Sequence, residues 1–142
     1  MIYNRGRAAA CPLFSLVASE HDDSMTPHQR MQRIDTLLSH VWMVRAFVKH
    51  SDEAAEDDEL AGVHRELYDY MLALGAPLKA GDTDEYLRVA KKKFSKLRAA
   101  SELFREIQPD ISGHTNFQMA VQSLSAAVEA IGELLQRPES DS

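Results

Sequence analysis

The stretch FQMAVQSLSAAVEAIGELL, residues 117–135, carries a large apolar side chain at every third or fourth position. These side chains are Phe117, Val121, Leu124, Val128, Ile131 and Leu135. Steps of three and four residues align them along one stripe of an α-helix. Because a helix with one apolar stripe must bury that stripe against neighbours, the stretch predicts one helix of a larger helical core.

Three earlier stretches of the chain repeat this spacing. Their stripe residues are Ile34, Leu37, Val41, Val44 and Val48; Leu60, Val63, Leu67, Tyr70 and Leu74; and Leu87, Ala90, Phe94, Leu97, Ser101 and Phe104. Connections of about 3 to 8 residues between four helices make sequential neighbours antiparallel. We therefore predict an all-α fold, an antiparallel up-down-up-down four-helix bundle.

Helix-start signals precede each stretch. Thr26 can cap a first helix that starts at Pro27 and runs to about Lys49. Ser51 or Asp52 can cap the second helix. The third and fourth helices begin with capping-box spacings, Asp82 with Glu85 and Thr115 with Gln118.

Glycine and proline predict where three of these helices end. Gly75 followed by Pro77 ends the second helix after Leu74, because glycine favours the position after a helix and proline removes a backbone donor. The third helix should end before Pro109 and the fourth before Pro138.

The composition of the 142 residues is that of one globular domain. Its single cysteine, Cys11, excludes an internal disulfide and a cysteine-based zinc site, and favours a cytoplasmic location. No apolar run approaches the ~20 residues that a membrane span needs. The net charge of −6 argues against nonspecific binding of nucleic acid by the whole surface.

The first helix has an unusual middle, since residues 41–48 are apolar nearly all round. If Val44 faces the core, Trp42 points roughly 160° away from it at 100° per residue. Leu38 and Ala46 lie on the same outer side as Trp42. Because aromatic residues are enriched in interfaces, we predict that Trp42, Leu38 and Ala46 pack against a second copy of the chain, giving a homo-oligomer.

The chain divides into a loose or disordered tail at 1–25, the bundle at 26–137 and a disordered end at 138–142. Residues 1–24 have the outline of a signal peptide, with a basic start and a short apolar middle. We favour instead a disordered tail, or an upstream start codon with Met25 as the true first residue. Phe14 and Leu16 of this tail offer an alternative cover for Trp42.

Arg45 and His50 are separated by four residues, a spacing that resembles the catalytic motif of the HEPN family of small all-helical domains, which includes metal-independent ribonucleases. The resemblance implies that Arg45 binds a phosphate and that His50 moves protons. Ala46 stands where family members carry Asn, Asp or His. The alternative is that Arg45 lies beside the core stripe and pairs with Asp57 or Asp58.

A basic run occupies residues 88–98, where six Lys and Arg side chains occur without an acidic one. Arg88, Lys92 and Lys96 share one helical stripe, which predicts an anion-binding face that could hold phosphates. The alternative is a solvated face that complements residues 51–75, where eight acidic side chains accompany Arg65 alone among Lys and Arg.

Metal and cofactor motifs are missing from the sequence. No two of the six histidines are three or four residues apart, the spacing that would place two ligands on one helical face. The sequence also lacks a Glu-x-x-His pair, a glycine-rich phosphate loop and a nucleophile elbow. We therefore expect neither a metal site nor a cofactor.

The block from His40 to Leu74 resembles a family of uncharacterised bacterial all-helical proteins, and this resemblance implies no activity. Our functional hypothesis is a non-enzymatic helical interaction or adaptor module that self-associates. The alternatives are a HEPN-like ribonuclease that uses Arg45 and His50, and a phosphate or nucleic-acid binder that uses the basic run.

Overall fold

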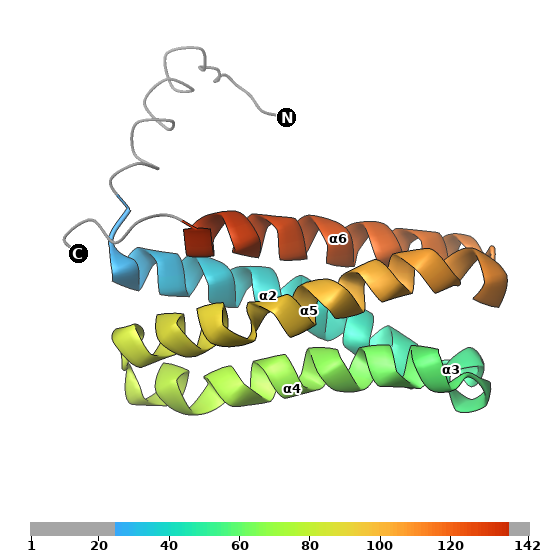
Figure 1. Cartoon of the computed structure of the whole chain (residues 1–142), viewed down its shortest axis with the longest axis horizontal. Helices are drawn as coiled ribbons and strands as arrows, with labels where there is room; N and C mark the ends of the chain where they lie inside the picture. The colour runs from blue at the N-terminus through green and yellow to red at the C-terminus, as the bar shows by residue number, and fades with distance from the viewer. Residues whose placement is uncertain (1–24, 137–142) are drawn as a thin grey trace, which may run out of the picture.

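The computed structural model of the chain describes residues 25–136 (Figure 1). Of the expected N-terminal tail only Met25 is included, and its side chain packs against the core. The expectations for residues 1–24, among them Cys11, Phe14 and Leu16, lie outside the described residues. So does the expected disordered end at 138–142.

The described part of the chain is helical almost throughout and contains no strand. Its helices are α2 (Pro27–Lys49), α3 (Asp52–Glu56), α4 (Asp58–Ala80), α5 (Thr83–Ile111) and α6 (Thr115–Gln136). The prediction of an all-α fold is confirmed. No helix among residues 25–136 combines the length and the apolar character needed to cross a membrane.

The start of α2 agrees with its sequence signals. The Thr26 side chain accepts a hydrogen bond from the backbone N–H of Gln29, and the Gln29 side chain accepts one from the backbone N–H of Thr26. These reciprocal bonds satisfy two backbone donors at the end of the helix, with Pro27 as its first residue.

The expected second helix is divided at Asp57. The short α3 is capped by Ser51, whose side chain accepts from the N–H of Ala54. Asp57 then adopts an extended conformation, and its carboxylate accepts from the N–H of Leu60 to begin α4. The division has a local cause, because an aspartate can bind backbone donors in place of the helical carbonyl.

The predicted ends after Leu74 and before Pro109 are wrong. Helix α4 continues through Gly75 and Pro77 to Ala80, and α5 continues through Pro109 to Ile111. Both prolines lie in the last turn of their helices, and each removes one backbone hydrogen bond, to the carbonyl four residues before it, without ending the helix there. The residue that ends α4 is Gly81, whose left-handed φ of 70° suits glycine.

The expected cap of the last helix also shifts by one residue. Thr115 is the first residue of α6, and His114 precedes it as the capping residue. The His114 ring nitrogen Nδ1 accepts from the N–H of Asn116, and its carbonyl accepts from Phe117 and Gln118.

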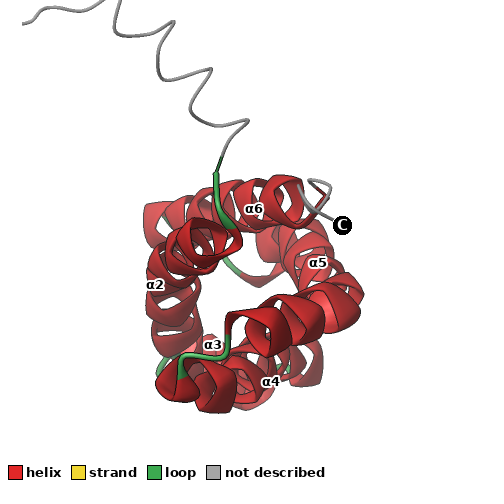
Figure 2. Ribbon diagram, turned by 90° about the vertical axis from the view of Figure 1, so that its left-hand side faces the viewer, coloured by secondary structure: helices red, strands yellow, loops and turns green. Residues whose placement is uncertain are grey.

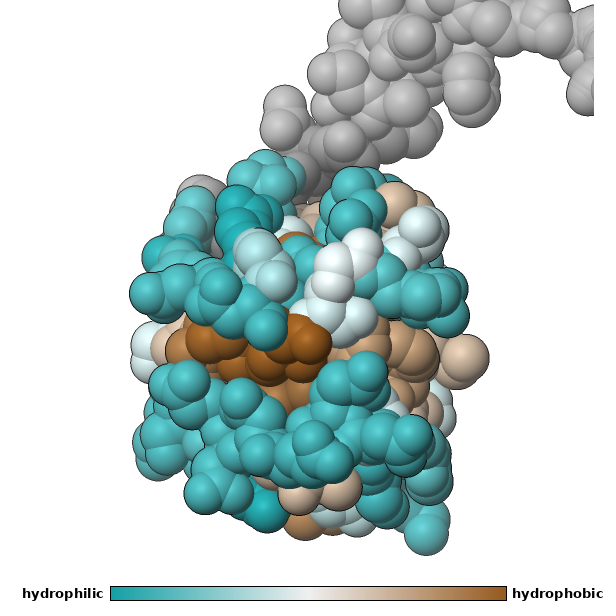
Figure 3. Space-filling view, turned by 90° about the vertical axis from the view of Figure 1, so that its right-hand side faces the viewer, coloured by the Kyte–Doolittle hydropathy of each residue, from teal (hydrophilic) through white to brown (hydrophobic). Residues whose placement is uncertain are grey.

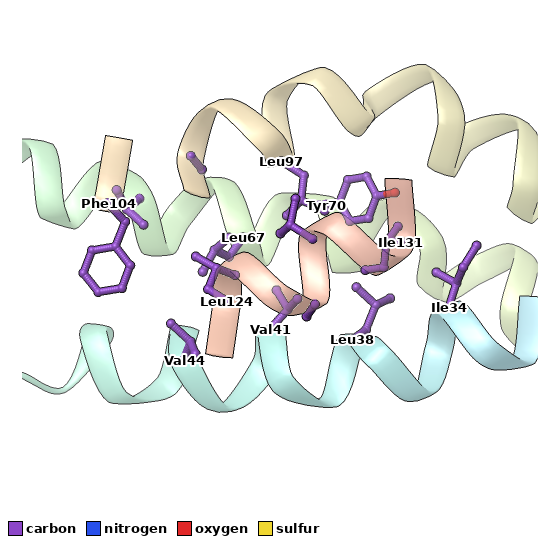
Figure 4. Packing of buried hydrophobic residues seen from close by; sticks show 14 of the residues in the cluster. Ile34, Leu38, Val41, Val44, Leu67, Tyr70, Leu97, Phe104, Leu124 and Ile131 are labelled. Carbon is purple, nitrogen blue, oxygen red and sulfur yellow. The ribbon is translucent and has the colours of Figure 1, made fainter. Parts of the chain in front are cut away.

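The four long helices enclose a common core (Figures 1 and 2). Helix α2 packs against α4 and α6, while α5 packs against the same two helices from the other side. The predicted stripe residues are buried in this core, except that Leu37 and Phe94 are only partly buried. Figure 4 shows Ile34, Leu38 and Val41 of α2 among core residues of the other helices.

Candidate interaction surface

The side of α2 that faces the core differs from the one expected. Ile34 and Val41 are completely buried, so the centre of the buried stripe lies near them and not at Val44. Trp42 follows Val41 by one residue, or about 100° around the helix. It therefore lies at the edge between core and solvent, with 46% of its surface exposed.

The three residues predicted for self-association consequently separate. Leu38 is only 6% exposed and belongs to the core, which corrects its expected position on the outer side. Ala46 is partly buried and Trp42 is exposed.

Arg45 lies between two aromatic rings. Its guanidinium carbon is 4.7 Å from the centre of the Trp42 ring and 4.6 Å from the centre of the Tyr68 ring. Trp42 belongs to α2 and Tyr68 to α4, so this cation–π stack joins the two helices at the surface. The alternative pairing with Asp57 or Asp58 does not occur, because Arg45 forms no ion pair within the described chain.

A shallow apolar groove of about 250 Å³ lies between α2 and α4 beside this stack. Leu38 and Leu74 contribute to its lining from the core, and Asp35 and Ser39 line it from α2. Gly75 also lines the groove and has no atom within 4 Å of where a Cβ would stand. The groove is thus partly a consequence of a glycine near the C-terminal end of α4.

Exposed apolar side chains are concentrated on the same two helices. Of the six large hydrophobic residues that are exposed among residues 25–136, only Met119 lies outside α2 and α4. We call the surface around the groove the α2/α4 face. It consists of Trp42, Tyr68, Met71, Leu72, Gly75 and Leu78.

His64 lies on α4 one turn before Tyr68 and has several basic neighbours. Burial is the main reason why the pKa of His64 is lowered, and the charges of Arg65, Arg45, Lys49 and His50 lower it further. Every charged neighbour that shifts this imidazole is therefore basic.

The proposed catalytic pair is placed differently from what the ribonuclease interpretation needs. The Arg45 guanidinium lies against two aromatic rings, and its buried Nε atom has no hydrogen-bond partner in the described chain. His50 is exposed at the end of α2, where its backbone N–H bonds to the carbonyl of Ala46. No hydrogen bond joins Arg45 to His50 among the residues described.

The basic face of α5 is smaller than the sequence indicates. Arg88 donates two hydrogen bonds to the carboxylate of Glu85, at 2.9 and 2.8 Å. This hydrogen bonding lowers the pKa of Glu85, and Arg88 is thereby engaged within its own helix. Lys92 and Lys96 are exposed and form no ion pair within residues 25–136.

The surface has two other notable features, a charged groove and a second hydrophobic area. A groove of about 430 Å³ between α5 and α6 is lined by arginines of α5 and glutamates of both helices. A hydrophobic area also occurs at the end of the molecule that carries α3 (Figure 3). Helix α5 ends there, with Ile107 and Ile111 packed against the core and partly exposed, so we interpret this area as the open edge of the core.

No group of three histidine, cysteine, aspartate or glutamate side chains converges into a metal site within the described part of the chain. Comparison with protein-family models, with curated proteins and with solved structures finds no match for this chain.

Sequence reasoning found Trp42 but missed the residues of α4 that complete the face. Leu78 was excluded because the second helix was expected to end at Leu74. Tyr68 and Leu72 are four residues apart and outside the apolar stripe, and this spacing was the available signal for a second apolar surface on α4.

Proposed function

We propose that this protein is an antiparallel four-helix bundle that acts as a non-enzymatic interaction module and self-associates through the α2/α4 face. The observation that carries the proposal is the exposed stack of Trp42, Arg45 and Tyr68 beside an apolar groove. Tryptophan, tyrosine and arginine are the residues that most often dominate the binding energy of interfaces.

The bundle arrangement is supported by which helices touch. Each of the four long helices packs most extensively against two others, in the cyclic order α2, α4, α5, α6, and α2 also contacts α5. The connections from α4 to α5 and from α5 to α6 are only two and three residues long. Such short connections favour antiparallel neighbours.

The stack also suits binding for an entropic reason. Immobilising a long side chain on association costs free energy, and Arg45 is already held by two rings before a partner arrives. Exposed apolar residues grouped on one side of a molecule mark interaction sites. A second copy supplies a surface of the same character, and two-fold pairing covers both faces at once.

The other functional hypotheses stay predictions. The ribonuclease interpretation gains no support from the position of Arg45 between two rings. Phosphate or nucleic-acid binding on α5 would depend on Lys92 and Lys96 without Arg88. The cytoplasmic location remains a prediction from the single cysteine.

Light scattering coupled to size-exclusion chromatography tests the proposal over a range of protein concentrations. We expect a dimer for the wild-type chain and a dissociation constant raised on the order of 10-fold or more by Trp42→Ala, as for a residue that dominates an interface. Met119→Ala is the matched control, because Met119 is a similarly exposed apolar residue on α6. A wild-type monomer, or equal weakening by both variants, would contradict the proposal.

A further inference from the structure

Asp35, Trp42 and Lys49 form one line on the surface of α2. Successive members are seven residues apart, which places them about 10.5 Å apart along the axis and within about 20° of one another around it. All three side chains are exposed. Neither Asp35 nor Lys49 forms an ion pair within the described chain, so both charges remain available to a partner.

The opposite charges are equally distant from Trp42, one on each side of it. A two-fold axis that passes through Trp42 exchanges the two ends of the helix between copies. Lys49 of each copy then lies opposite the partner's Asp35. A parallel arrangement would instead place like charges against each other.

The residues around Trp42 fit close contact between two copies of α2. Ser39 and Ala46 are small residues that stand one turn before and one turn after Trp42. They leave space beside each tryptophan for the tryptophan of the other copy. Small residues at a helix crossing allow the two backbones to approach.

Lys49 is one of several basic side chains near His64. The positive neighbours that lower the pKa of His64 include Lys49 itself, Arg45, His50 and Arg65. Asp35, two helical repeats of seven residues before Lys49, lines the groove. In the antiparallel arrangement this end of each copy faces the Asp35 end of the other, so that Asp35 pairs with Lys49.

From this arrangement we infer that the second copy docks antiparallel on α2, with the two-fold axis at Trp42 and two Asp35–Lys49 pairs between copies. The inference rests on the proposed self-association and adds the identity of the partner segment, its direction and its register.

A charge-swap mixing experiment tests this register by measuring dissociation constants in sedimentation-equilibrium runs. Asp35→Lys makes both ends of the line positive, and Lys49→Asp makes both ends negative. Each variant alone should dimerise on the order of 10-fold more weakly, since two attractive contacts become repulsive. An equimolar mixture should form a heterodimer at least as tight as the wild-type dimer, because both contacts are then attractive.

Two further variants serve as controls. The double variant Asp35→Lys/Lys49→Asp should restore the wild-type dissociation constant. Lys93→Asp makes the same charge change on the exposed surface of α5, and its mixture with Asp35→Lys should show no preference for the heterodimer. Circular dichroism checks that each variant is folded, which the exposure of the substituted residues leads us to expect.

The outcomes separate the two proposals. Suppose that the wild type is a dimer which Trp42→Ala weakens, but that the heterodimer of the two charge variants has a dissociation constant no lower than that of either variant alone. This result would overturn the antiparallel register and leave self-association through the α2/α4 face intact. A wild-type monomer would overturn both.

Discussion

Two buried tyrosines show how differently one residue type is accommodated in the same core. The Tyr70 hydroxyl donates a hydrogen bond of 2.9 Å to the carbonyl of Ala90. The Tyr86 hydroxyl is buried and has no hydrogen-bond partner in the described chain. Burial raises the pKa of both phenols, and for Tyr86 the negative charge of Asp35 adds to the effect.

This difference predicts opposite responses to removal of the hydroxyl. Tyr86→Phe should leave the free energy of unfolding unchanged or raise it, since the substitution removes an unpaired polar group from the core. Tyr70→Phe should lower it by about 1 kcal/mol through loss of a buried hydrogen bond. Urea unfolding of the two variants measures both values. A cost at Tyr86 equal to that at Tyr70 would show that the Tyr86 hydroxyl has a partner after all.

Helix α4 shows at the scale of one element how local signals compete. Gly75 and Pro77 are both helix-ending residues, yet the helix passes through them and ends at Gly81. Leu74 and Pro77 are buried, so packing against the neighbouring helices favours continuation of the helix. Of Gly75, Pro77 and Gly81, Gly81 alone adopts a backbone conformation that other residue types rarely take.

Substitution by alanine should therefore change the free energy of unfolding in opposite directions at Gly75 and Gly81. Gly75→Ala should stabilise the protein by about 0.5–1 kcal/mol, because alanine favours the helix and the added methyl group meets no neighbour. Gly81→Ala should destabilise it by about 1 kcal/mol, the cost of a left-handed conformation. Urea unfolding measures the free energy of unfolding of each variant, provided that the dependence of this free energy on denaturant concentration is unchanged. Stabilisation by both substitutions would mean that Gly81 does not hold the end of α4.

In the molecule as a whole, most of the exposed large apolar side chains among residues 25–136 lie on α2 and α4. The stripes of the four long helices are buried against one another, apart from the partly buried Leu37 and Phe94. The α2/α4 face remains after this core is complete. Because the core is already packed, the exposed apolar side chains of this face are covered more readily by a second copy than by a rearrangement within one chain.

Assembly also predicts how stability should depend on concentration. Only native chains dimerise, and a higher protein concentration therefore favours the native state. The thermal unfolding midpoint of the wild type should rise with protein concentration. For Trp42→Ala the midpoint should be nearly independent of concentration over the same range. Differential scanning calorimetry at several concentrations provides the comparison. A wild-type midpoint that stays constant while chromatography shows a dimer would indicate that the dimer contributes little to folding stability.

Much of the fold could be predicted because its signals are local. The start of α2 at Thr26 and Pro27 agrees with expectation, and so do the buried stripes. The helix ends at Gly75 and Pro109 could not be read correctly, since packing overrides the local preference of single residues. The candidate surface was predicted only through Trp42, because its other half comes from a helix distant in sequence.

The sequence by itself determined that four stretches of this chain form helices with one buried stripe each, since the spacing of apolar residues is a property of each stretch alone. The tertiary structure decided that Leu38 enters the core, that Arg45 lies between Trp42 and Tyr68, and that Gly75 contributes to a groove. These outcomes depend on the angle through which α2 is rotated toward α4, and that angle is set by the packing of all four helices together.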